Sequence, residues 1–119
     1  MAPELRTVIY PVSDLAAAKS TYSALLGVPP TVDEAYYVGY DAGGWHLGLD
    51  PNGAAQGMTG PQTFWHVADL ETSVAALVAG GATVERPARD VGGGRLIAVV
   101  RDTDGNTTGL LQPGPHEKA

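Results

Sequence analysis

The stretch QTFWHVADLETSV, Gln62–Val74, decides the fold because the chain carries the same pattern earlier, as TVIYPVSDLAAAK, Thr7–Lys19. In both stretches, alternating β-branched or aromatic residues lead through Val, a small residue and Asp-Leu into an amphipathic run. Alternation of this kind is typical of a β-strand, and apolar residues at helical spacing are typical of a helix. The sequence therefore contains one strand–helix unit twice.

The repeat extends beyond the strand and the helix. The aligned copies match Val12, Asp14, Leu15, Asp41, Gly44 and Gly48 with Val67, Asp69, Leu70, Asp102, Gly105 and Gly109. The second copy needs a short insertion to keep both sets aligned, and the glycine run VGGGR at 91–95 is the expected place. Self-similarity in a fixed order indicates a duplicated structural unit.

Each copy predicts a strand, a helix and three further strands. In the first copy we expect a strand at 6–12, a helix that starts after Ser13 or Asp14 and stops at Gly27, and strands near 30–34, 35–41 and 45–50. In the second we expect a strand at 62–67, a helix at 69–79, and strands near 82–88, 95–102 and 106–112. The predicted fold class is α+β, with βαβββ modules at about 5–51 and 62–113, a glycine-rich linker at 52–61 and a frayed tail at 114–119. The whole chain, 1–119, is expected to be a single domain.

Composition narrows the classes of partner. The 119 residues carry a formal net charge of −6 and form no basic stripe, which argues against nucleic acid and anionic membranes. Cysteine is absent, so thiolate chemistry and cysteine-based zinc sites are excluded. No leader-like segment or long apolar stretch is present, and we expect a cytoplasmic protein that does not enter a membrane.

Strand alternation assigns side chains to faces. Facing the helices we expect Val8, Tyr10, Val12, Thr63, Trp65 and Val67, with Trp45 also in the core. On the opposite faces we expect Thr7, Ile9, Pro11, Gln62, Phe64 and His66. On the last strand of the first module, His46, Gly48 and Asp50 share one face. On the last strand of the second module, Thr107, Gly109 and Leu111 share one face.

The opening VSDL, its echo VADL and the closing RDTDGNTTGLLQ together resemble the glyoxalase / bleomycin-resistance / extradiol-dioxygenase group, the vicinal-oxygen-chelate superfamily. The resemblance covers about residues 5–113. It implies that each module curls into half a barrel whose concave face forms a ligand cup. A homodimer is the expected assembly, with the barrels formed either within one chain or across the dimer. The superfamily contains both metalloenzymes and metal-free drug binders, so the fold alone does not give the activity.

The resemblance also implies four positions for metal ligands. In this chain they fall on Thr7, Gly48, Gln62 and Gly109. The two glycines have no side-chain donor, and threonine and glutamine are weak ligands for a divalent ion. If the alignment were shifted by two residues along the strand, His46 or Asp50 would take the position of Gly48. Together with Gln62 this would still leave the site without a third strong metal ligand. We therefore expect neither a metal nor another cofactor.

The candidate ligand-binding residues come from the predicted cup. They are Thr7, Ile9, Tyr37, His46, Gly48, Gln62, Phe64, His66, Arg95, Thr107 and Gly109. The histidines offer hydrogen bonds or proton transfer, Phe64 and one of Tyr36 or Tyr37 offer aromatic contact, and Arg95 offers a partner for a carboxylate or phenolate. The glycines either let a flat ligand approach the backbone or relieve a bend in the sheet.

These residues predict a metal-free protein that binds a small aromatic or apolar molecule, with sequestration of an antibiotic-like ligand as the superfamily's precedent. The negative net charge favours a cationic ligand. One alternative is a glyoxalase-like lyase, isomerase or dioxygenase, either metal-dependent or using His46 or His66 as acid and base. A second alternative is an interaction module whose cup is filled by its own side chains.

Overall fold

The computed structural model describes residues 2–117. The chain divides into two units, one formed by Arg6–Gln62 and the other by the residues from Thr63 onward together with those before Arg6. The division falls at the start of the second copy of the repeat, where the sequence predicts the second module to begin. Neither helix of the described part has the length and apolar content needed to span a bilayer.

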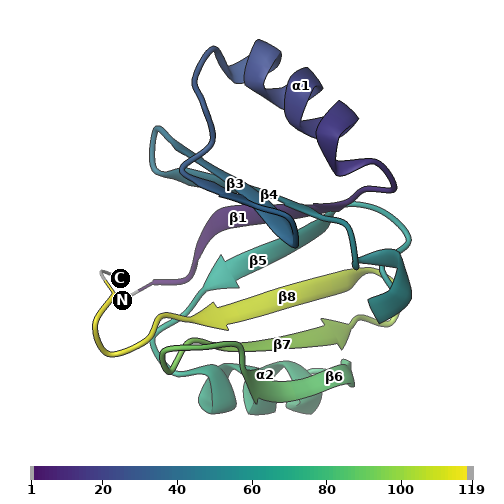
Figure 1. Ribbon diagram of the computed structural model, residues 1–119. Helices are drawn as coiled ribbons and strands as arrows, with labels where there is room; N and C mark the ends of the chain where they lie inside the picture. Colours follow the sequence, from purple (N-terminus) through teal and green to yellow (C-terminus); the bar gives the residue numbers. More distant parts are fainter. Residues whose placement is uncertain (1, 118–119) are drawn as a thin grey trace. The chain divides into compact units, whose positions relative to one another are not determined.

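The first unit has the predicted strand–helix–three-strand order. Its elements are β1 (Glu4–Pro11), α1 (Leu15–Leu26), β2 (Val32–Glu34), β3 (Tyr37–Ala42) and β4 (Trp45–Asp50). The strands lie in the order β2-β3-β4-β1, and only the β1–β4 pair is parallel. Figure 1 shows α1 over one face of these strands.

Capping and packing explain why α1 forms where it does. The Asp14 side chain accepts a hydrogen bond from the Ala17 amide (3.0 Å), which satisfies a donor of the first turn. Gly27 ends the helix in the left-handed region, at φ 71°. The face of the sheet under α1 carries buried Val38, Tyr40 and Leu49, against which the helix packs its apolar side chains. The helix is therefore fixed by a cap at each end and by partial burial of its apolar face.

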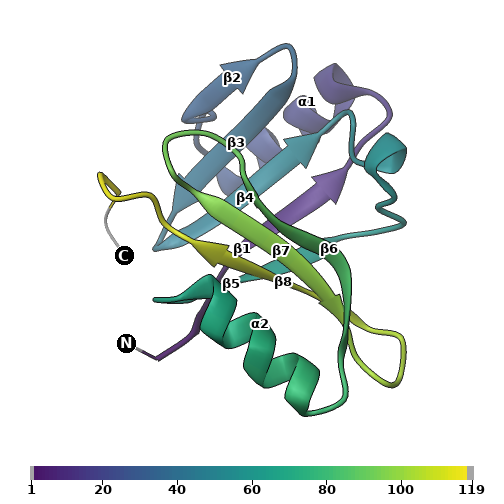
Figure 2. The same ribbon diagram turned by 90° about the horizontal axis from the view of Figure 1, so that it is seen from below.

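The second unit repeats this arrangement. Its elements are β5 (Gln62–His66), α2 (Leu70–Ala79), β6 (Thr83–Asp90), β7 (Leu96–Arg101) and β8 (Thr107–Gln112). The strand order is β5-β8-β7-β6, and α2 packs against β6, β7 and β8 (Figure 2). Its core is formed by Val67, Leu70, Ala98 and Leu110. Asp69 caps α2 by accepting from the Thr72 amide (3.1 Å), as Asp14 caps α1.

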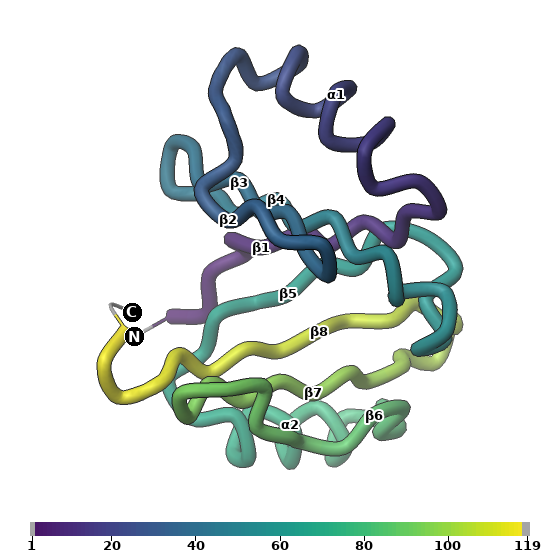
Figure 3. The backbone as a smooth tube through the Cα atoms, viewed as in Figure 1, coloured from purple at the N-terminus to yellow at the C-terminus, as the bar shows by residue number. Residues whose placement is uncertain are grey.

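Strand register confirms the internal duplication. In the first unit the parallel pair places Ile9 opposite Gly48, and in the second it places Phe64 opposite Gly109. Gly48 and Gly109 are one of the pairs that the sequence alignment of the copies matches, and their partner strands therefore lie in the same register in both units. The same order of elements occurs twice along the tube in Figure 3, and the fold is α+β with two βαβββ modules.

The linker at 52–61 contains a short 3-10 turn at Ala54–Gln56. Two local expectations are wrong. The tail is not frayed as far as Glu117, because Pro113–Glu117 fold into a turn against the loop before β7; residues 118–119 lie outside the described part. Trp45 and Trp65 are not in the core, since 53% of Trp45 and 36% of Trp65 remain exposed. Trp45 is the first residue of β4, next to a hairpin turn. The hydrophobic cluster under α2 includes Val67 but does not include Trp65.

Candidate functional site

Five of the predicted binding residues lie on one face of the first unit. Thr7 pairs with His46 and Ile9 with Gly48, on the face turned away from α1. β3 contributes to the same face the residues that alternate with buried Val38. We call this surface the glycine face; it comprises Thr7, Ile9, Tyr37, Gly39, Asp41, His46 and Gly48.

Two glycines form the floor of this face. Gly39 and Gly48 are directly opposite each other on β3 and β4. A Cβ at Gly39 would lie 2.8 Å from His46 Cε1 and 2.9 Å from Tyr37 Cε2. A Cβ at Gly48 would overlap the Tyr37 hydroxyl and lie 2.6 Å from Ile9 Cδ1. Only glycine therefore lets the two rings lie this close to the backbone.

The rings of Tyr37 and His46 form a flat platform above that floor. They are nearly parallel, with an interplanar angle of 10° and centroids 6.0 Å apart. Their polar edges meet, because the Tyr37 hydroxyl and His46 Nε2 are 2.6 Å apart. Both residues are half-buried. Tyr36 is 67% exposed, so of the two neighbouring tyrosines it is Tyr37 that belongs to this site.

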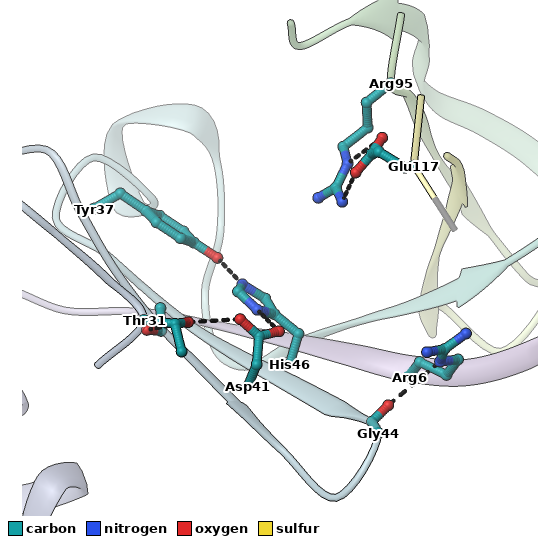
Figure 4. A network of polar contacts seen from close by, with 9 residues as sticks. Arg6, Thr31, Tyr37, Asp41, Gly44, His46, Arg95 and Glu117 are labelled. Carbon is teal, nitrogen blue, oxygen red and sulfur yellow. Dashed lines mark hydrogen bonds and ion pairs between the residues drawn. The ribbon is translucent and has the colours of Figure 1, made fainter. Parts of the chain in front are cut away.

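A chain of hydrogen bonds continues from the platform (Figure 4). His46 Nδ1 lies 2.9 Å from Asp41 Oδ1, and the Thr31 hydroxyl donates to Asp41 Oδ2 at 2.6 Å. An ionised carboxylate only accepts, so Nδ1 carries the ring proton in this contact. In the neutral ring Nε2 then accepts from the Tyr37 hydroxyl. Asp41 thereby fixes both the orientation and the tautomer of His46.

Thr31, Gly39 and Asp41 are site residues that were not predicted. The signal for two of them was present, because a hairpin at residues 42–45 and strict alternation place Asp41 opposite His46 and Gly39 opposite Gly48. Thr31 precedes β2 and reaches Asp41 through its hydroxyl, which no periodicity indicates.

The second unit fills the equivalent surface with apolar side chains. Phe64 is 8% exposed and lies over Gly109, whose added Cβ would overlap the phenyl ring and lie 2.5 Å from the Thr63 carbonyl oxygen. Val99 and Leu111, on the same face, are also buried. The space that Gly109 leaves is therefore occupied by Phe64, as the space at Gly48 is occupied by Tyr37.

The residues at the four metal positions implied by the resemblance do not fit a divalent ion. Gly48 and Gly109 lack donors, and in each case an aromatic ring takes the place that a ligating side chain would need. Thr7 and Gln62 are buried, with 4% and 8% exposed, and offer only neutral oxygens. Among residues 2–117, no three or more histidines, aspartates or glutamates converge as a metal site.

Arg95, His66 and Glu117 form a second polar group, within the second unit. Glu117 accepts hydrogen bonds from Arg95 and from the Gly114 amide. The Arg95 hydrogen bond is the main cause that lowers the pKa of Glu117, with the Gly114 amide and the charges of Arg95 and His66 adding to it and burial opposing it. Thr107, the remaining candidate, starts β8 opposite Arg101.

The second unit also has an apolar groove, which is separate from the predicted binding residues. An apolar groove of about 500 Å³ runs between α2 and β6 and is lined mainly by Val74, Val78, Val84 and Pro87. It contains no histidine and lies on the α2 side of the strands, so it is separate from the surface around Phe64.

Comparison with known proteins decides the family. A model of the Glyoxalase/Bleomycin resistance protein/Dioxygenase superfamily matches residues 5–110. The chain belongs to this superfamily. This confirms the resemblance drawn from the repeated VSDL and VADL segments. No curated protein matches the sequence.

Several solved structures share the fold at low sequence identity. A hypothetical protein from Bacillus halodurans has a TM-score of 0.77 at 11% identity, with 100% of both chains covered. Streptomyces coelicolor methylmalonyl-CoA epimerase has a TM-score of 0.72 at 18% identity, also with 100% of both chains covered. A superfamily member from Vibrio splendidus has a TM-score of 0.65 at 15% identity, covering 93% of this chain and 98% of the other. At these identities the likeness concerns the fold.

Proposed function

We propose that this superfamily member binds a small, largely aromatic molecule on the glycine face, without a metal ion. The observation that carries this proposal is the platform of Tyr37 and His46, held flat against Gly39 and Gly48. Parallel rings whose inner faces rest on the backbone present their outer faces to a planar ligand, which stacks on them. The hydrogen bond between the rings keeps the platform in place before the ligand arrives, which reduces the entropy lost on binding.

Charge favours a cationic ligand. The chain carries a net charge of −6, and the Asp41 carboxylate borders the platform through His46. A cation over an aromatic face gains ~1 kcal/mol, and more when water is excluded. We therefore propose a planar cation, with a neutral ring of the same size binding less tightly and an anion least.

Thermal-shift measurements with three compounds of one shape test this proposal. We expect 2-naphthylmethylammonium to raise the melting temperature of the protein most, 2-naphthylmethanol less and 2-naphthoate least, because a ligand that binds only the folded state stabilises it. Tyr37→Ala should abolish the shift, and Tyr36→Ala, at an exposed neighbour, should retain it. Absence of any shift, or an unchanged shift in Tyr37→Ala, would rule out the platform as the binding site.

An acid–base enzyme is a second candidate, favoured by the Asp41–His46–Tyr37 chain. A histidine oriented by a carboxylate is the arrangement expected of a general base. Methylmalonyl-CoA is a suitable probe, because an epimerase of that substrate shares the fold. If the Tyr37 oxygen removes the proton from the substrate carbon while the hydroxyl passes its own proton to His46 Nε2, the protein should exchange that hydrogen for deuterium in D₂O, and His46→Gln should slow exchange ~100-fold. Asp41→Asn should slow it as well. Exchange no faster than in buffer would exclude this reaction for this substrate.

A further inference from the structure

The chain after β8 folds back onto the loop that precedes β7. Pro113–Glu117 form a turn closed by a hydrogen bond from the Glu117 amide to the Gly114 carbonyl (3.0 Å). In Figure 3 this turn is the yellow end of the tube beyond β8. The loop beneath it contains Gly92, Gly93 and Gly94, all with positive φ. The turn therefore packs against a loop that has no side chains over three successive residues.

The turn presents one carboxylate to one guanidinium. Arg95 Nε donates to Glu117 Oε2 at 3.2 Å, and its terminal nitrogen donates to Oε1, so the contact is bidentate (Figure 4). The Gly114 amide donates to Oε2 at 2.5 Å. A planar guanidinium that meets both oxygens is the geometry by which arginine recognises carboxylates. Glu117 therefore sits in a complete carboxylate receptor with three donors.

Arg95 and His66 both favour a negative charge on the carboxylate held in the receptor. The pKa of Glu117 is lowered first by the Arg95 hydrogen bond, and the charge of His66 on β5 acts in the same direction. Of the Arg95 and Glu117 side chains, 38% and 34% are exposed, so water and small solutes reach the pair. A free carboxylate in solution can therefore compete for the same donors.

Close packing by glycine holds the turn in position. A Cβ on Gly114 would overlap the Gly93 carbonyl oxygen, and a Cβ on Gly94 would lie 2.8 Å from Pro115 Cδ. Glu117 is thus held near Arg95 at the high effective concentration of an intramolecular partner. Such an occupant keeps external carboxylates out unless the turn opens.

We propose that Arg95 forms the anchor of a binding site for a carboxylate-bearing ligand, and that the C-terminal turn inhibits this site by placing Glu117 in it. The site and its inhibitory segment both lie in the second unit. The proposal is independent of the platform on the glycine face, which uses other residues and another ligand chemistry.

Benzoate is the probe, and neutral benzamide of the same shape is its control. We expect Glu117→Gln to bind benzoate at least ~10-fold more tightly than the unmodified chain, because the competing intramolecular carboxylate is removed. A chain ending at Pro113 should show the same gain. Adding Arg95→Gln to Glu117→Gln should abolish binding, and benzamide should bind none of these proteins. Isothermal titration gives the affinities, and the shift of the Arg95 Nε–H resonance on titration identifies the anchor.

Two further variants separate the proposal from simpler explanations. Gly114→Ala opens the turn sterically while keeping Arg95 and Glu117, and we expect it to gain benzoate binding as well. Glu71→Gln makes the same charge change at the start of α2 and should gain nothing. The proposal is overturned if the folded Glu117→Gln and shortened chains bind benzoate no better than the unmodified chain, if binding survives the loss of Arg95, or if Glu71→Gln gains as much.

Discussion

Phe64→Ala is expected to lower the free energy of unfolding by ~3 kcal/mol, at the low end for truncation of a buried phenylalanine. The Phe64 ring is 8% exposed and occupies the space that Gly109 leaves open on the neighbouring strand. Its removal leaves a cavity that the strands cannot close, because Gly109 has no side chain to move into it. Urea denaturation followed by circular dichroism gives the value.

Phe64→Leu is the matched control, because it retains most of the apolar volume and should cost ~1.5 kcal/mol or less. A loss below ~1 kcal/mol for Phe64→Ala would mean that the ring contributes little packing, since buried large-to-small changes cost several times more. The surface would then be open to a ligand, contrary to the packing seen at Gly109.

Gly48→Ala is expected to destabilise the protein by ~2 kcal/mol, the usual cost of an extra methyl group in a filled space. The new Cβ would overlap the Tyr37 hydroxyl and approach Ile9. We expect the tyrosine to lose its hydrogen bond to His46, which NMR of the imidazole nitrogens detects. Gly60→Ala is the control, because nothing lies within 4 Å of an added Cβ there and the change should cost less than ~0.5 kcal/mol.

A double-mutant cycle with Tyr37→Ala isolates the cause. If the clash with the ring is responsible, Gly48→Ala should cost much less in the Tyr37→Ala background, with a coupling energy of ~1 kcal/mol or more. Equal costs in both backgrounds would assign the loss to the backbone or to Ile9. The platform of the glycine face would then not depend on the absence of a side chain at residue 48.

The fold was predictable because its determinants are local and occur twice. Each module has an aspartate cap, a helix and a closing strand with glycine at the same register, and these features survive in the sequence even where the side chains differ. The alternation that places Tyr10 and Val12 beneath α1 is equally local. The burial of individual side chains was less predictable. Whether Trp45 and Trp65 are covered depends on how far the neighbouring helices and strands extend over them, which alternation along one strand does not indicate.

The candidate site was only partly predictable. Tyr37, His46 and Gly48 follow from alternation, whereas the role of the glycines does not. Gly48 and Gly109 were expected to leave space for a ligand or to relieve a bend in the sheet, but the chain's own Tyr37 and Phe64 occupy that space. The partner of Arg95 was missed because Glu117 is 22 residues away and in a segment expected to fray. Contacts of this kind depend on how loops close, which periodicity does not encode.

The aromatic rings over Gly48 and Gly109 also constrain protein engineering. A designer who wishes to install a metalloenzyme centre would naturally restore glutamate at these two residues. Either single change would meet an occupied volume, so a misfolded product would be the first outcome. The productive order is to shorten Tyr37 and Phe64 first and then to introduce the acidic ligands, which turns a two-step design into a four-step one.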